Sequence, residues 1–292
     1  MSAASPPIAR ISSRRRRTDQ AARALLGAGT VVAVIPLVLV LYYLLKKGLP
    51  AWSIDFFTTD PTGKFFGDPG GIKSALLGTI EIVGLATLIA GPIGIGVAIY
   101  LTEYGRDSRF ASAVRYFIDV MTGVPSIVFG LFIYITLVVT KVGGSGFAGW
   151  KGAIALALLA LPIVTRSAEV VLELVPDSLR EAALALGAPR WRVIMRVVLP
   201  AAAPGILTGV LLAVARAAGE TAPLLFTATI VKASTFDLQA PMNSLPAQIF
   251  ADVGQAQDRL VERAWGAALA LVMLILIFTV LSRLLAGRSR LR

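Results

Sequence analysis

Six long apolar stretches limit what this chain can fold into. They cover residues 24–45, 74–100, 117–139, 152–175, 201–230 and 264–281. At a rise of about 1.5 Å per residue, each is long enough to be considered as a helix crossing a bilayer core about 30 Å thick. Apolar residues make up 56% of the chain and charged residues 15%, which leaves too little polar surface for a soluble globule of 292 residues. We therefore expect an all-α integral membrane protein with six transmembrane helices.

Two of these stretches carry a second signal. The clean apolar part of the fourth ends at Val164 and Arg166 follows, so this helix either stops early or carries a charge that neighbouring helices shelter. The first follows the basic run 14–17, as the core of a signal peptide would. It is too long for one and lacks a small-residue cleavage site, so we interpret it as a retained helix.

The basic residues predict the orientation. Of the 28 Lys and Arg residues, eighteen lie on the side that holds both termini, nine lie on the other side, and Arg216 lies inside a span. Because Lys and Arg in short loops favour the cytoplasm, both termini are predicted to be cytoplasmic. The expected organisation is a basic tail over residues 1–23, a transmembrane domain over 24–286 that contains a cytoplasmic elbow at about 176–200, and a second tail over 287–292.

Composition excludes several kinds of function. The net charge of +11 is dispersed at span ends, so it indicates membrane topology rather than nucleic-acid binding, and the run 14–17 suits anionic lipid headgroups. The chain has no Cys and no His, which removes thiolate chemistry and imidazole metal sites. The nearest match to a phosphate-binding loop has Ile72 in place of its second glycine. Active transport would therefore need an ATPase on another chain, and no catalytic or metal site is expected here.

The elbow is predicted to contain two short helices. Ser178 and Glu181 have the spacing of a capping box, which predicts a helix start at Ser178, and Gly187 suits a left-handed position after its end. Pro189 then fits the first turn of a second helix that ends near Leu199-Pro200. The residues alone also allow an amphipathic helix that lies flat on the membrane surface.

Glycines mark two other positions. The run 91–96, with Pro92 among three glycines, is interpreted as a helix break or a close-packing site, and a tolerated kink is the alternative. Gly205 and Gly209 have the spacing of a close contact between helices of an assembly.

The fifth stretch holds the most informative charge. Arg216 lies about fifteen residues into it, roughly 22 Å along a helix and so at mid-membrane depth. Glu220 follows four residues later on the same helical face. The two could form a static ion pair, or Arg216 could hold an oxyanion in two-point contact while Glu220 keeps that contact weak. Glu81, about seven residues into the second stretch, could pair with a buried Arg or face the outer headgroups.

The elbow also resembles a known family. Glu181-Ala182-Ala183, Gly187 and the run from Val197 to Pro200 are similar to the EAA loop of ABC importer permeases, with Val197 where Ile is frequent. The resemblance implies a type I-like permease core whose loop docks on a cytoplasmic ATPase. It also implies the coupling residues, which are Glu181, Ala182, Ala183 and Gly187.

Within that family the chain resembles the PstA family, permease subunits of bacterial phosphate importers. The resemblance is carried by residues 215–228, 122–130 and 176–187. It implies that Arg216 contacts passing phosphate, that Glu220 modulates it, and that Arg166 is a second cationic group near the inner end of the path, although Arg166 could equally be a topology-setting charge.

The same resemblance implies the partners and the location. These are a second, PstC-like permease, a PstB-like ATPase dimer that holds ATP and Mg²⁺, an external PstS-like phosphate-binding protein, and the bacterial inner membrane. Two alternatives stay open at this point, a permease of the same fold for sulfate or molybdate and an ion-coupled secondary carrier.

Overall fold

A computed structural model describes residues 13–64, 67–106, 108–144 and 146–288. The chain separates into two compact units, Met1–Lys46 and Lys47–Arg292. The first unit contains most of the long helix α1 (Ser13–Gly48), which includes the predicted first span. Residues 1–12 and 289–292 of the two predicted tails lie outside the described residues.

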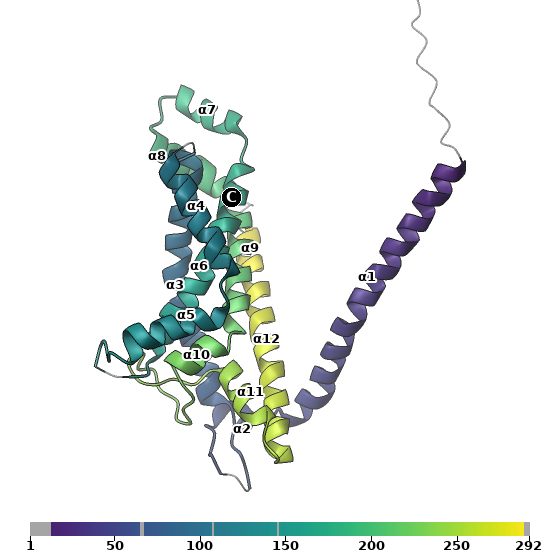
Figure 1. Ribbon diagram of the computed structural model, residues 1–292, viewed down its shortest axis with the longest axis vertical. Coiled ribbons are helices and arrows are strands. Elements are labelled where there is room, and N and C mark those ends of the chain that lie inside the picture. Colours follow the sequence, from purple (N-terminus) through teal and green to yellow (C-terminus); the bar gives the residue numbers. More distant parts are fainter. Residues whose placement is uncertain (1–12, 65–66, 107, 145, 289–292) are drawn as a thin grey trace, which may run out of the picture. The chain divides into compact units, whose positions relative to one another are not determined.

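Four helices of the second unit are long and apolar enough to span a membrane (Figure 1). They are α3 (Lys73–Ile99) with the π-helical segment η2 (Tyr100–Tyr104), α6 (Gly149–Glu173), α9 (Leu199–Ala218) with its N-terminal extension, and α12 (Asp258–Arg288). Helix α6 packs against both α3 and α9, and their apolar side chains form the main core. Because α6 continues past Arg166, the charge lies within this helix rather than after its end.

The third predicted span is not one helix. Helix α4 (Arg109–Gly123) ends before Val124, and α5 (Ser126–Ile133), with the π-helical segment η3 (Tyr134–Val138), leaves at 100° to it. Pro125 explains the bend, because proline disfavours the helical conformation at the residue before it and Val124 is extended, with φ −74° and ψ 130°. The described part of the chain therefore has five spanning helices, or six if the bent pair counts as one span.

The fifth predicted span is displaced along the sequence. Its helix begins at Arg190 with α8 (Arg190–Val193), continues through the π-helical segment η4 (Ile194–Val198) into α9, and ends at Ala218. The predicted helix end near Leu199-Pro200 is therefore wrong. Pro200 lies in the first turn of α9, directly after the π-helical turn, where the lack of its N–H is tolerated. After a break at Gly219, the short helix α10 (Ala222–Thr227) packs on α5 and α6.

Small residues bring the helices together. A Cβ atom on Gly205 would lie 2.5 Å from Val171, and one on Gly209 would lie 2.4 Å from Ser167, so these glycines make a close contact between α9 and α6 of this chain. A contact with another subunit of an assembly stays a prediction. The interpretation of residues 91–96 as a break is wrong, because α3 is continuous through Pro92. Close packing is confirmed there at Gly94, whose Cβ would lie 2.9 Å from Val164.

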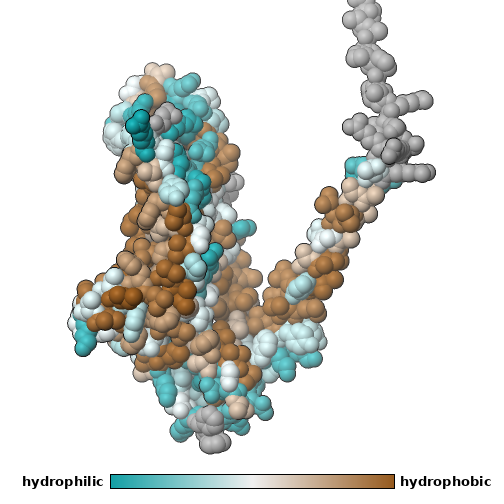
Figure 2. All heavy atoms as spheres, viewed as in Figure 1, coloured by the Kyte–Doolittle hydropathy of each residue, from teal (hydrophilic) through white to brown (hydrophobic). Residues whose placement is uncertain are grey.

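Short elements gather at the end opposite the elbow. They are η1 (Leu49–Ala51), α2 (Ile54–Thr58), α10 and α11 (Leu245–Val253), while α7 (Asp177–Ala185) and α8 form the other end (Figure 1). In Figure 2 the middle of the second unit is mostly hydrophobic and both ends are more hydrophilic, as a membrane-spanning protein requires.

Candidate functional site

The elbow begins with α7. The predicted capping box is wrong: α7 begins at Asp177 rather than after Ser178, and no side chain caps its N-terminus. Pro176 precedes the helix, and Asp177 provides the acidic group that the N-terminal end of a helix dipole favours. The prediction for Gly187 is confirmed, because its φ of +79° lies in the left-handed region, where glycine carries no Cβ penalty.

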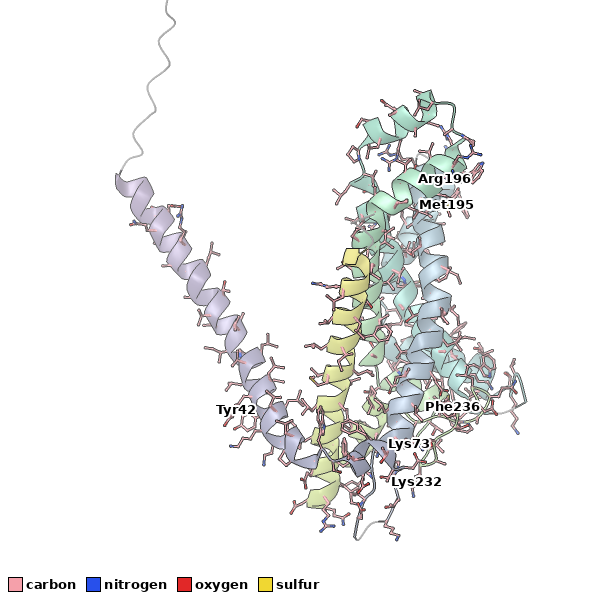
Figure 3. All side chains as sticks on the ribbon, turned by 180° about the vertical axis from the view of Figure 1, so that it is seen from behind. Tyr42, Lys73, Met195, Arg196, Lys232 and Phe236 are labelled. Carbon is pink, nitrogen blue, oxygen red and sulfur yellow. The ribbon has the colours of Figure 1, made fainter. Side chains whose placement is uncertain are left out.

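The two faces of α7 have different surroundings. Glu181 and Ala182 are exposed, as is Gly187, whereas Ala183 packs against a buried apolar cluster that includes Leu172 and Val198. Three of the four predicted coupling residues thus face outward, while Ala183 attaches the elbow to the helices below it. In Figure 3, Met195 and Arg196 lie at this end of the unit and Lys73, Lys232 and Phe236 lie at the other.

Arg216 lies at the end of a helix rather than in its middle. It occupies the last turn of α9, because the helix stops at Ala218. Glu220 lies past the helix end, yet its Oε1 is 3.7 Å from the Arg216 Nε. The Arg216 side chain is 57% exposed and that of Glu220 is 16% exposed. This open, loosely paired guanidinium can take up an anion without first breaking a tight ion pair.

Arg166 is placed differently. Its guanidinium donates to Glu169 at 2.9 Å and lies 3.1 Å from Asp119 of α4. Glu169 also accepts from Arg115 at 2.6 Å, so two cations and two carboxylates link α4 to α6. The Arg166 side chain is still 47% exposed.

A groove of about 750 Å³ lies over α4, α6, α9 and α12. Its polar lining residues are Thr122, Arg166, Ser167, Thr208, Thr279 and Arg283. The groove also reaches Ala215, the residue before Arg216.

The packing of α6 on α9 gives the relative depth of the two arginines. Gly209 faces Ser167 and Gly205 faces Val171, so the two helices are antiparallel and Arg166 lies level with residue 210. Arg216 is six residues further along α9, about 9 Å from that level. The structure thus places Arg166 between Arg216 and the elbow, but it does not bring the two guanidiniums into contact.

Glu81 fits neither predicted role. Both of its carboxylate oxygens are buried and have no hydrogen-bond partner among the described residues. Helix α3 begins at Lys73, so Glu81 lies two turns inside the helix and not at an end that headgroups reach.

Several buried charges were not predicted from the sequence. Arg263 is 6% exposed and is paired through Nε and Nη2 with Asp252, at 2.8 and 2.9 Å. Lys151 is fully buried and donates to the carbonyl oxygens of Leu137 and Gly146. The distribution of Lys and Arg predicts both as charges of the outer loops that set the topology. No local signal in the sequence distinguishes such a residue from an exposed one.

This chain is similar to known membrane transport proteins. The family model described as "Binding-protein-dependent transport system inner membrane component" matches residues 90–291. Two relatives are each named "Phosphate transport system permease protein PstA". That of Haemophilus influenzae is 44% identical and covers 87% of this chain and 88% of its own length. That of Yersinia pestis is 42% identical and covers 94% of this chain and 92% of its own length.

Solved structures share the fold at low identity. A bacterial alginate ABC transporter has a TM-score of 0.63 at 14% identity and covers 93% of this chain and 94% of its own. The MetNI methionine ABC transporter, in an inward-facing conformation, has a TM-score of 0.54 at 19% identity and covers 75% of this chain and 94% of its own. These likenesses place the fold among ABC importer permeases.

The fold and the family model define the class of protein. This chain belongs to the binding-protein-dependent transport system inner membrane components and, within them, to the PstA family of permease proteins. It is a multi-pass membrane protein and a transport subunit rather than an enzyme.

Proposed function

We propose that the chain is the transmembrane permease subunit of an ATP-driven importer of inorganic phosphate. It forms half of the translocation path, together with a second homologous permease of PstC type. A PstB-type ATPase dimer binds the elbow and holds ATP and Mg²⁺, and a PstS-type binding protein delivers phosphate from outside. The names of the relatives support the substrate, and the ABC transporter neighbours support the kind of assembly.

The observation that carries this proposal is the state of Arg216. Its guanidinium is more than half exposed, and its ion pair with Glu220 is long at 3.7 Å. A planar guanidinium can donate two parallel hydrogen bonds to two oxygens of one phosphate. Glu220 competes for the same guanidinium, so the bound anion is held briefly and released. Arg166, about 9 Å closer to the elbow, lines the groove and provides a further positive charge on the way to that end.

Transport also needs two states of the path. An ATPase cycle drives net import only if phosphate binds the outward-facing and inward-facing states with different affinity. The exposed face of α7, with Glu181 and Ala182, is the surface through which the ATPase selects between these states. In this proposal the elbow and both termini are cytoplasmic, and the membrane is the bacterial inner membrane, as the distribution of Lys and Arg predicts.

Reconstitution of the complex tests the substrate. Proteoliposomes that contain both permeases and the ATPase would be supplied with binding protein and radiolabelled phosphate, with and without ATP on the elbow side. We expect uptake only with ATP, and competition by unlabelled phosphate but not by sulfate or molybdate. Competition by sulfate or molybdate would identify a different oxyanion permease, and accumulation without the ATPase would identify a secondary carrier.

A further inference from the structure

Arg180 of α7 has an unusually complete set of partners. It directly precedes Glu181, yet it points away from the exposed face and its side chain is only 16% exposed. Its Nε and Nη2 donate to Glu103 Oε1 at 3.1 and 2.8 Å. Its Nη2 also donates to the carbonyl oxygen of Leu172 at 2.9 Å, and its Nη1 donates to that of Val175 at 2.5 Å and to Asp177 at 3.1 Å. Each of the three guanidinium nitrogens of Arg180 therefore donates at least one hydrogen bond.

These partners belong to three different elements. Glu103 lies in η2, the π-helical end of α3, and is itself only 11% exposed. Leu172 and Val175 lie at and just after the C-terminal end of α6, where carbonyl groups lack partners within the helix. A cation at this end also faces the negative pole of the helix dipole. Arg180 therefore caps α6 and pairs with α3 while its own backbone belongs to the elbow.

A second arginine also binds the same π-helical segment. Arg115 of α4 donates to the Leu101 carbonyl oxygen in η2 at 2.8 Å, as well as to Glu169 of α6. Segments of π-helix are frequent at functional positions. The C-terminal ends of α3 and α6 are thus joined to each other and to the middle of α4 by charge-assisted hydrogen bonds, which are stronger than neutral ones. Of the two arginines, Arg180 is the one that extends this connection to α7.

We propose that Arg180 is the positioning residue that makes the elbow and the inner ends of α3 and α6 move as one body. This inference rests on the proposed function, in which the ATPase moves α7. Without Arg180, α7 keeps its chain connection to α6 through residues 174–176, the apolar contact of Ala183 and the exposed pair of Arg106 with Asp177 at 4.0 Å. It loses its charge-assisted hydrogen bonds to Glu103 and to the carbonyl groups at the end of α6, so a displacement of α7 is passed less completely to these helices. Arg166 lies on α6 and lines the groove, so the path would then respond poorly to ATP hydrolysis.

The test measures coupling rather than activity alone. In proteoliposomes with the complete importer, phosphate uptake and ATP hydrolysis are measured together for Arg180→Gln, Glu103→Gln and the double variant. We expect each single variant to retain the copurifying ATPase and its hydrolysis, while phosphate transported per ATP falls by about tenfold or more. The double variant should transport as much phosphate per ATP as Arg180→Gln does, because both substitutions break the same connection between Arg180 and Glu103.

Two further variants test the chemistry of the connection. Arg180 and Glu103 line a pocket of about 550 Å³ between η2, α7 and α8. Arg190→Gln is the matched control, since Arg190 is an exposed cation that lines this pocket as well. It should leave the ratio of phosphate to ATP within about twofold of the original chain, as exposed charges contribute little. Arg180→Lys should transport as little phosphate per ATP as Arg180→Gln, because one ammonium group cannot donate to Glu103 and to both carbonyl groups in the same geometry.

The outcomes separate this inference from the proposed function. If the unchanged complex shows no ATP-dependent phosphate uptake, the proposed function fails, and the inference fails with it. If the unchanged complex transports phosphate and Arg180→Gln keeps its ratio of phosphate to ATP, only the role of Arg180 is overturned. Loss of the ATPase from purified Arg180→Gln would also overturn the role of Arg180, because it would show that Arg180 only maintains the structure of the elbow. Full coupling in Arg180→Lys would overturn it as well, because it would show that a positive charge alone suffices.

Discussion

Gly209 of α9 lies against Ser167 of α6 so closely that a Cβ atom on the glycine would stand 2.4 Å from the serine Cβ. This contact fixes the register of the two helices that carry Arg216 and Arg166. A Cβ cannot be accommodated at such a distance unless the helices separate.

The contact predicts that replacing glycine by alanine has different effects on stability at two positions. Gly209→Ala should destabilise the folded protein by about 1–3 kcal/mol, the usual cost of overpacking. Gly84→Ala in α3 is the matched control, because nothing lies within 4 Å of its Cβ and alanine favours a helix. The measurement is the fraction of monodisperse protein that survives heating in detergent, and equal survival of the two variants would show that α6 and α9 do not pack as described.

The buried pair of Arg263 and Asp252 predicts a larger loss. Asp252→Asn leaves the charge of Arg263 buried without its carboxylate partner, which should cost about 3–5 kcal/mol. Glu262→Gln removes the exposed carboxylate of the residue directly before Arg263 and should change stability by less than about 0.5 kcal/mol. The same heating assay measures both, and a wild-type profile for Asp252→Asn would contradict the burial of this pair.

Gly187 predicts an order of effects in the elbow. Its φ is +79° and no atom lies within 4 Å of its Cβ position, so the cost of a side chain there is backbone strain alone, about 1–2 kcal/mol. Asn tolerates the left-handed region better than other residues, and a β-branched residue tolerates it least. Gly187→Asn should therefore retain more copurifying ATPase than Gly187→Ala, and Gly187→Val should retain the least. Equal recovery from all three would show that this turn does not position the docking surface.

The sequence predicts features that depend on local pattern. The apolar stretches, the suitability of Gly205 and Gly209 for a close helix contact and the left-handed turn at Gly187 all follow from spacing and residue type. That α6 of the same chain is the helix in contact with these glycines does not follow from their spacing. The bend at Pro125 is harder to predict, because residues 117–139 are apolar and long enough for one straight span. Pro125 signals a boundary or a kink, but nothing in the composition says that the chain turns by as much as 100° there.

The charged contacts could not be predicted for a different reason. Arg180 and Glu103 are 77 residues apart, and Arg263 and Asp252 are eleven apart across a turn. Each arginine, considered alone, satisfies the rule that basic residues lie at span ends. Pairing depends on how the helices pack, and a sequence alone does not give that packing.

The position of Arg216 combines both cases. Its partner Glu220 is predicted by spacing, but the helix between them ends at Ala218, so the pair closes across a break rather than along one face. The break follows from Gly219 and Pro223, because both residues disfavour continuation of a helix. The hydropathy of the surrounding stretch nevertheless suggests a continuous helix.

Phosphate uptake by Arg216→Gln tests the central claim most directly. The complete importer would be purified with this variant or with Arg109→Gln, which removes an exposed arginine at the first position of α4. ATP-dependent uptake would be measured at equal amounts of complex. We expect Arg109→Gln to transport as the unchanged protein does, and Arg216→Gln to assemble fully but lose about 99% of its uptake, the effect of removing a contact that the moving anion requires. Normal uptake by Arg216→Gln would contradict the account.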